Sequence, residues 1–310
     1  MKRFISLVIA IVLMFYFDLP IYAASNESTV ETQTNEQVIY SEYNSYIETK
    51  QKTDEYLIAE GYTIDEIEEL RDFCFEDALL ERASHTEEEL YAMGYTDEQI
   101  NLLQAYDGSP LTVDNPVIAA TAVCTGSVTF HSYNTSTGQL MFLYHFSWSV
   151  QPLYGHKDNV AVTWKGVDKD AHYMSSSATY KRGTIYYSST STGEDYKSES
   201  LALNAMPGFD GYEAEYESLQ VVPEHNGTLA VWAKEGYLWF GVTPDGNNTF
   251  NMLKVYGAVG HVTKKISASS SIGYSSSGNS YSFSFTPTDC CQTVGTANYT
   301  LKPDGTCTKN

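Results

Sequence analysis

The side chains best suited to catalysis or metal binding are scattered along this sequence. Seven His residues occur, and none of them stands at the spacing of a metal-ligand pair. The run "HTEEEL" at His85 lacks the second His of the H-E-x-x-H zinc motif, and "GYSSSG" at 273–278 does not match the G-x-S-x-G turn of serine hydrolases. Neither a C-x-x-C pair nor a calcium-loop pattern occurs in the sequence. We therefore predict a protein that is not an enzyme and that carries no metal and no cofactor.

One acidic stretch, "DGYEAEYES", is the exception that could do chemistry. As a strand it would place Glu213, Glu215 and Glu217 on one face. Paired carboxylates catalyse glycoside hydrolysis, whereas a row of like charges on an exposed strand edge protects against aggregation. We favour the protective role, and glycoside hydrolase stays the third functional alternative.

Aromatic residues are the most abundant candidates for binding a partner. The sequence holds 25 Tyr and four Trp. Rings that are not buried in the core could form a flat platform for sugars or for a protein. Core packing is the competing use of the same rings. We take Trp164, Trp232 and Trp239 as the binding candidates and expect at least one Trp at the surface, with Trp148 the weakest candidate.

A stretch of 23 residues without charge, Ile266–Thr288, offers a second binding feature. Apolar and small polar residues alternate along two arms, and Gly278–Asn279 could turn between them. Membrane-inserting β-hairpins alternate in this way but need arms of about 9–11 residues. The second arm is short for that role, so we favour an ordinary hairpin. The candidates for membrane contact are Ile272, Tyr274, Tyr281, Phe283 and Phe285.

The five Cys residues allow disulfides in an exported protein. Adjacent cysteines rarely pair with each other, so two pairings are open for the four that follow residue 116. Either Cys290 or Cys291 joins Cys124, and the other joins Cys307; free buried thiols are the alternative. Cys74 is left over, and we expect it in a helix core.

The residues after Pro116 follow the period of β-strands. In "QLMFLYHFSWSV" every second residue from Leu140 to Val150 is apolar or aromatic, which predicts a strand with one buried face. Further short strands are separated by Gly, Asn and Ser turns. Residues 117–310 are therefore expected to form an antiparallel β-sandwich-like domain, with a barrel as the alternative.

The residues before Pro116 repeat themselves. At an offset of 33 residues, nine of the 18 positions from 53 to 70 are identical, including the "GYT" of 61–63 and 94–96. Gly fits the left-handed end of one helix, and Thr with a Glu or Gln three residues later forms the capping box of the next. We expect capping boxes at Thr63, Thr86 and Thr96, and two helical hairpins over 51–106 that share a core. The expected core residues are Leu57, Ile67, Leu70, Leu90, Ile100 and Leu103, with Cys74 and Ala78 continuing the face of Ile67 and Leu70.

Charge and targeting signals complete the expected organisation. A basic start, an apolar run and the small residues Ala23 and Ala24 predict a signal peptide over 1–23, with an uncleaved anchor as the alternative. Residues 24–50 are polar and are expected to be a disordered tether, and 107–116 a linker. Of the formal net charge of -21, most lies in 25–115, which argues against nucleic acid as a partner.

Together these features predict an α+β chain in two parts, a small all-α repeat followed by an antiparallel β domain. We expect a secreted, extracellular, non-enzymatic protein whose β domain binds a surface, a glycan or a protein. The acidic helices would be a spacer or a pro-region. The alternative is an antimicrobial or pore-forming toxin in which 25–115 is removed and Ile266–Thr288 meets the membrane.

Overall fold

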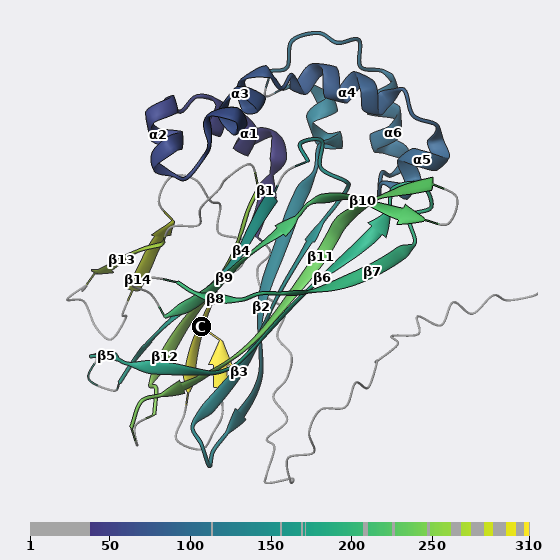
Figure 1. The fold of residues 1–310 in the computed structure, drawn as a ribbon. Coiled ribbons are helices and arrows are strands. Elements are labelled where there is room, and N and C mark those ends of the chain that lie inside the picture. The colour runs from purple at the N-terminus through teal and green to yellow at the C-terminus, as the bar shows by residue number, and fades with distance from the viewer. Residues whose placement is uncertain are drawn as a thin grey trace, which may run out of the picture.

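The computed structural model describes residues 38–261, apart from 113, 156, 169, 171, 207–209, 225–226 and 247–248, and four strand segments beyond them. It confirms an α+β chain with a helical N-terminal part and a largely antiparallel β part (Figure 1). The helices are α1 Glu42–Lys50, α2 Asp54–Ala59, α3 Ile64–Asp72, α4 Phe75–Ala83, α5 Glu87–Ala92, α6 Asp97–Gln104 and the 3-10 helix η1 Pro116–Ala120.

The helix starts follow the predicted capping chemistry. Capping boxes are present at Thr63, Thr86 and Thr96, where each Thr hydroxyl accepts from the third backbone N–H and the Glu or Gln side chain returns the bond. Gly61 and Gly94 have φ of 97° and 96°, as their places after α2 and α5 require. All six predicted core residues are buried: Leu57, Ile67, Leu70, Leu90, Ile100 and Leu103.

The Cys74 prediction is wrong. We expected one helix to carry Ile67, Leu70, Cys74 and Ala78, but α3 ends at Asp72 and Phe73 is extended. Cys74 is the first flanking residue of α4, makes no capping bond through its side chain, and is exposed. The Phe73 and Phe75 rings on either side of Cys74 pack edge-on, with centroids 6.1 Å apart.

The β part contains two seven-stranded sheets in which every pairing is antiparallel. Sheet A has the order β1-β2-β3-β11-β6-β7, with β10 also paired to β11; its strands are β1 Val38–Ser41, β2 Val123–Asn134, β3 Gln139–Trp148, β6 Ser176–Ser189, β7 Asp195–Leu201, β10 Leu219–Glu224 and β11 Gly227–Pro244. Sheet B has the order β16-β15-β12-β4-β9-β8, with β5 also paired to β4; its strands are β4 Lys157–Val167, β5 Tyr173–Met174, β8 Asn204–Ala205, β9 Gly211–Glu217, β12 Met252–Gly260, β15 Thr296–Leu301 and β16 Cys307–Lys309. A separate pair is formed by β13 Ala268–Gly273 and β14 Ser282–Pro287.

Aromatic rings from both sheets meet in one core. The Phe240 ring of β11 stacks on Phe142 of β3, with centroids 5.6 Å apart, and on Trp164 of β4, also at 5.6 Å. The alternating residues of β3 predicted to be apolar, from Leu140 to Trp148, are all buried. The buried residues of the helices belong to the same hydrophobic cluster, so the helical and β parts share their interior.

Residues 38–50 form a strand and a helix, although they fall within the tether expected over 24–50, of which 24–37 lie outside the described residues. Within that range β1 pairs with β2 at the edge of sheet A, with Ile39 opposite Thr125. Helix α1 follows directly, and Glu42, Tyr43 and Tyr46 are buried. The polar composition concealed this segment because its buried contacts come from two Tyr rings and one carboxylate, not from aliphatic residues. We call β1 and α1 together, Val38–Lys50, the N-terminal arm.

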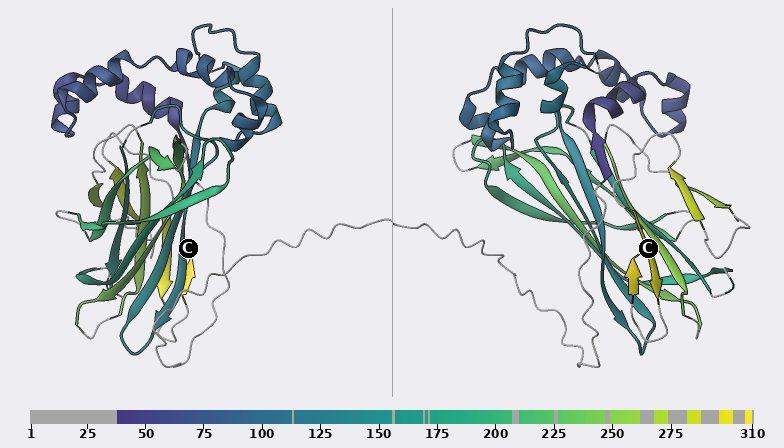
Figure 2. Two further views of the ribbon diagram at one scale, coloured as in Figure 1. Left: turned by 45° about the vertical axis from the view of Figure 1, so that its right-hand side comes forward. Right: turned by 180° about the vertical axis from the view of Figure 1, so that it is seen from behind.

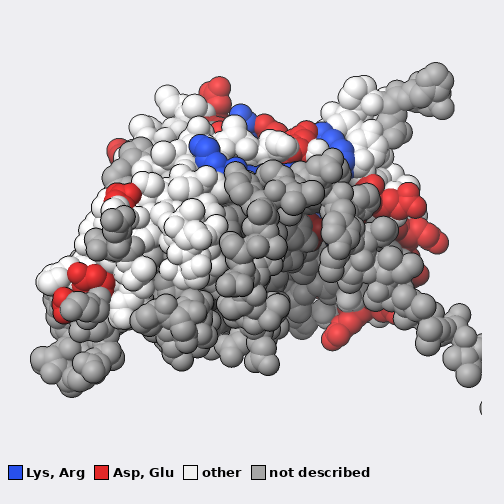
Figure 3. All heavy atoms as spheres, turned by 90° about the horizontal axis from the view of Figure 1, so that it is seen from below, with Lys and Arg blue, Asp and Glu red and all other residues white. Residues whose placement is uncertain are grey.

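The helices lie across one end of the two sheets (Figure 2). Gln151, just after β3, donates its backbone N–H to the Met93 carbonyl at 2.8 Å. The boundary expected at 107–116 therefore does not divide the structure, because β1 precedes the helices and yet belongs to sheet A. Viewed from the opposite end, the described surface is mostly uncharged, with acidic side chains at its margins and Lys and Arg side chains near the upper edge of the view (Figure 3). In the described part of the chain, no helix has the length and apolarity needed to cross a bilayer.

Candidate functional site

The outer face of sheet A carries a group of partly exposed aromatic rings. Strand alternation turns Leu140, Phe142, Tyr144 and Phe146 inward, so the residues between them face outward. The register places these outward residues beside Tyr237 and Trp239 of β11, which in turn lie beside Thr184 and Arg182 of β6. We define the aromatic face by its rings: His131, His145, Tyr180, Tyr186, Tyr237 and Trp239.

Trp239 lies at the centre of the aromatic face. It is half-buried, whereas Trp148, Trp164 and Trp232 are buried at 3%, 3% and 1% exposure. His131 meets it edge-on, with ring centroids 5.0 Å apart. His131 is exposed and occupies an irregularity of β2, between the paired residues Phe130 and Ser132. A bulge of this kind turns an additional side chain onto the outer face.

A second group on the same face combines rings with a carboxylate. Tyr237 stacks on His145 with centroids 4.3 Å apart, and Tyr186 meets Tyr237 edge-on at 5.6 Å. The Glu235 carboxylate accepts from the Tyr237 hydroxyl at 3.0 Å and lies 3.0 Å from Nε2 of His145. The hydrogen bond from His145 holds the pKa of Glu235 below its usual range, and burial followed by the Glu235 charge raises the pKa of Tyr237. Glu235 is therefore an ionised acceptor held in place between two rings.

The aromatic face is nearly neutral in a strongly acidic chain. Among the outward residues in the described part of β2, β3, β6 and β11 around Trp239, the charges are those of Arg182 and Glu235. The exposed Lys234 adjoins Glu235 at the irregularity of β11, and its charge helps to lower the pKa of Glu235. Thr and Ser hydroxyls fill the positions between the rings, as at Thr129, Thr184 and Ser147. The face can therefore offer ring surfaces and hydrogen bonds together, with little net charge.

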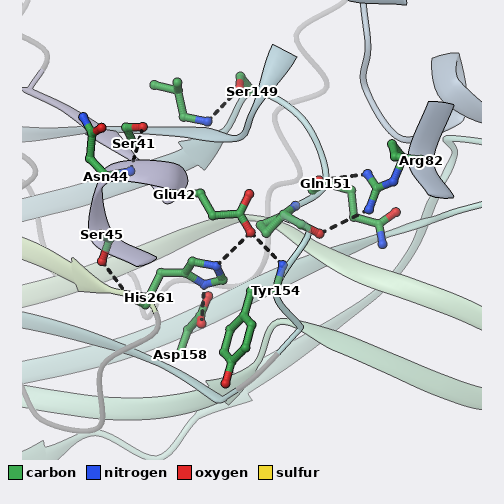
Figure 4. A network of polar contacts seen from close by, with 12 residues as sticks. Ser41, Glu42, Asn44, Ser45, Arg82, Ser149, Gln151, Tyr154, Asp158 and His261 are labelled. Atoms are coloured by element: carbon green, nitrogen blue, oxygen red, sulfur yellow. Dashed lines mark hydrogen bonds and ion pairs between the residues drawn. The ribbon is translucent and has the colours of Figure 1, made fainter. Parts of the chain in front are cut away.

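A second site lies inside the protein and joins three distant parts of the sequence (Figure 4). Nδ1 of His261, just after β12, lies 2.7 Å from Oδ1 of Asp158 on β4. Nε2 of the same ring lies 3.4 Å from Oε1 of Glu42 on α1, and that oxygen accepts the backbone N–H of Tyr154 at 2.7 Å. All three side chains are fully buried. We call Glu42, Asp158 and His261 the buried ion cluster.

The buried ion cluster holds a charged imidazole. Burial by itself lowers the pKa of His261, but the opposing effect of Asp158 and Glu42 is larger and raises it to about 10. The ring thus keeps its proton at neutral pH and forms an ion pair on each side. Through these contacts the cluster joins helix α1 to strand β4 of sheet B, which is a structural role.

A buried arginine makes a further joint nearby. Nη1 of Arg82, on α4, donates to the Gln151 carbonyl at 3.0 Å and to the Tyr95 hydroxyl at 3.1 Å, and Nη2 donates to the Pro152 carbonyl at 3.4 Å. The same loop supplies Tyr154 to the buried ion cluster. The loop after β3 is therefore held by α1 on one side and by α4 on the other.

Three residues with metal-binding atoms meet in the loop after β4, although we predicted no metal site. The ligand atoms of Asp168, Asp170 and His172 lie within 4.8 Å of one another. Oδ1 of Asp168 already accepts the backbone N–H groups of Asp170 and His172, at 2.8 and 2.9 Å, which explains the cluster as a turn. The D-x-D-x-H spacing is visible in the sequence, but exposed groups with this local role give no argument for a bound ion.

The other predicted site residues have mixed outcomes. Trp164 and Trp232 are core rings, since Trp164 donates Nε1–H to Ser176 Oγ at 3.0 Å within the core. Cys124 is a fully buried thiol, free within the described part of the chain, and burial raises its pKa. Its disulfide with Cys290 or Cys291 stays a prediction. The thiol points between the sheets from β2, which separates it from the surface. Cys290 and Cys291 lie outside the described residues, and of Cys307 only the backbone, in β16, is described.

The structure describes some of the residues predicted for the membrane hairpin, and it describes the acidic strand as β9. Ile272 on β13 is opposite Phe283 on β14, and Phe285 is opposite Ser270, whereas Tyr274, Tyr281 and the signal-peptide residues Ala23 and Ala24 lie outside the described residues. Glu215 and Glu217 are exposed on β9, and Lys157 lies 3.7 Å from Glu217.

Comparison with known proteins adds little to this description. No protein-family model and no curated protein matches the chain. One solved structure that matches is described by the words "AvmM Catalyzes Macrocyclization in Alchivemycin A Biosynthesis"; it shares 7% identity, covers 39% of this chain and 64% of that chain, and has a TM-score of 0.19. The chain thus matches just under two thirds of that protein's length, and a TM-score this low supports no statement about activity.

Proposed function

We propose that this is a secreted, non-enzymatic binding protein that holds a neutral glycan on the aromatic face. The observation that carries the proposal is the array of partly exposed rings around Trp239, with ordered hydroxyl and carboxylate groups between them. Tyr and Trp combine a flat apolar surface with a polar edge and lose little side-chain entropy when they bind. A sugar ring presents the complementary combination, apolar C–H faces with hydroxyls around its rim.

The charges of the face argue for a neutral partner. A polyanion would require a cluster of Lys and Arg. Here Arg182 stands opposite Trp239, and Lys234 lies beside the Glu235 carboxylate, which offsets its charge. A membrane surface would favour a continuous apolar band, whereas Ser and Thr alternate with the rings here. Of the partners expected from the sequence, a glycan therefore fits best.

In the same proposal, the two sheets form a sandwich-like body and the duplicated acidic helical hairpins are a permanent cap. A removable pro-region is disfavoured because Glu42, on α1, and Arg82, on α4, are both built into the interior. The pore-forming alternative has less support, since the paired arms β13 and β14 have six residues each, below the roughly 9–11 of a spanning strand.

Retention on polysaccharides tests the proposed function. The protein without residues 1–23 is passed through gels containing a neutral glucan, a chitin-derived polymer or an anionic polysaccharide. We expect retardation by a neutral polymer and its loss in Trp239→Ala. The matched control is Tyr91→Ala, which removes an exposed ring from α5 (48% exposed) that does not belong to the aromatic face. Equal retention of the two variants, or retention by the anionic polymer alone, contradicts the proposal.

A further inference from the structure

The N-terminal arm is attached to the rest of the protein by strand pairing, by polar contacts and by ring packing, in which the Tyr43 and Tyr46 ring centroids lie 5.1 and 5.3 Å from that of Phe75. Strand β1 contributes four residues to the edge of sheet A. Helix α1 contributes the Glu42 carboxylate to the buried ion cluster, and the Ser45 hydroxyl donates to the His261 backbone carbonyl at 3.2 Å. His261 is thus held by α1 through both its ring and its backbone.

A strand of four residues at a sheet edge is weakly held by its own backbone pairs, because such edges open locally at low free-energy cost. The ring contacts of Tyr43 and Tyr46 do not change with pH, so the contact that can respond to pH is the one between the Glu42 carboxylate and His261. A buried carboxylate needs a positive charge beside it, since an unpaired buried charge carries a desolvation penalty of several kcal/mol.

His261 supplies that positive charge. In the described part of the chain, the other ionisable groups near the cluster include Tyr154 from the loop after β3, Cys124 on β2, Tyr216 on β9 and Tyr95 after α5, all with pKa values raised by burial and therefore uncharged at neutral pH. Arg82 faces Tyr95 and the loop carbonyls. Trp148 closes the remaining side, with its ring centroid 4.9 Å from that of His261.

We propose that the N-terminal arm is a proton-gated latch, which stays closed while His261 carries its proton between Glu42 and Asp158 and opens when that proton is lost. Loss of the proton leaves two buried carboxylates on either side of a neutral ring. The arm can relieve this repulsion by withdrawing Glu42 into solvent, whereas Asp158 is fixed in β4 between β12 and β9. Opening also uncovers the edge of β2 over 123–126.

The direction of the pH dependence follows from the two states of His261. Its pKa is about 10 in the closed state, against an ordinary value of 6.5 for an exposed imidazole, so closing the latch binds a proton. The latch is tightest below pH 6.5 and loosens as the pH rises towards about 10. Within this window the ratio of closed to open molecules falls roughly tenfold per pH unit.

Hydrogen exchange read by mass spectrometry measures this ratio on the full chain without residues 1–23. The exchange rate of each peptide is divided by its intrinsic rate at the same pH, which yields a protection factor. We expect the protection of 38–50 to fall by roughly 50–100-fold between pH 7 and pH 9, while that of 139–148 in β3 stays within about threefold. An arm protection that does not change over this range, or a loss shared equally by β3, overturns the latch.

Two variants and a matched control separate the latch from general destabilisation. His261→Gln should lower the protection of the arm at pH 7 and abolish its pH dependence. Glu42→Gln leaves the Asp158–His261 pair intact and should reduce the slope, which keeps the test valid if the His261 variant fails to fold. His85→Gln removes a partly exposed histidine that also faces a Glu, at 3.3 Å, and should retain the wild-type slope. An arm protection in Glu42→Gln equal to the wild type at both pH values also overturns the proposal.

Discussion

Two glycines with the same backbone conformation and different surroundings provide the sharpest test of how the helices are docked. Gly61 and Gly94 occupy equivalent places in the repeated sequence, with φ of 97° and 96°. A Cβ at residue 61 would meet nothing within 4 Å, whereas at residue 94 it would lie 3.0 Å from the Ser149 carbonyl oxygen and 3.3 Å from the Val150 Cα. Both of these neighbours are backbone atoms and cannot rotate away.

The magnitudes follow from this difference. Alanine at either position carries the cost of a positive φ, about 1–2 kcal/mol. At Gly94 the close approach adds the cost of overpacking, about 1–3 kcal/mol. We therefore expect Gly61→Ala to lower the free energy of unfolding by about 1–2 kcal/mol and Gly94→Ala by about 2–5 kcal/mol. A difference of this size corresponds to several °C in Tm for a chain of this length.

Urea denaturation followed by circular dichroism at pH 7 measures both variants against the parent protein. The substitution and the φ are the same at both positions. The difference between the two losses of unfolding free energy therefore cancels the backbone strain and measures the contact between the turn after α5 and the end of β3. Equal losses for the two variants would show that this contact is not tight, and the docking of the helices would have to be described differently.

Three further predictions concern the core, the interface and the division of the chain. Trp232→Ala should cost about 3–5 kcal/mol because the ring is fully buried, and Trp239→Ala less than half of that; similar losses in urea denaturation would contradict the placing of Trp239 on the surface. Arg82→Met should cost about 2–4 kcal/mol, since it leaves buried carbonyls without donors; a thermal melt within 1 °C of the parent would refute that joint. A fragment of residues 116–310 should melt below the whole protein or aggregate, because it lacks β1 and Glu42; an unchanged Tm would restore the independent β domain first expected from the sequence.

Local features were predictable because their causes are local. The capping boxes, the two glycine turns and the alternation of β3 each depend on residues within a few positions of one another, and all are present in the structure. Cys74 was misplaced because nothing in the helical period signals the break between α3 and α4. The N-terminal arm was missed since its composition is polar and its partners lie far along the chain.

The candidate sites show the same limit more strongly. Glu42 and His261 are 219 residues apart, and Asp158 and His261 are 103 apart, so no spacing motif could join them. The aromatic face was anticipated as a class of feature, but its members could not be chosen. Trp164 and Trp239 both stand in alternating strands, and only the pairing of the sheets decides that one is turned inward and the other outward.

The pairing of β1 with β2 has a consequence for the order of folding. The two strands are neighbours in sheet A, yet all six α-helices lie between them in the chain. Closing so long a loop in an unstructured chain is slow, whereas helical hairpins form from contacts a few residues apart in microseconds or less. We expect the capped hairpins to form early. Their formation would shorten the effective loop between Ser41 and Val123 and so bring β1 close to β2. On this view the "GYT" turns contribute to the speed at which the sheet is completed as well as to the stability of the helices.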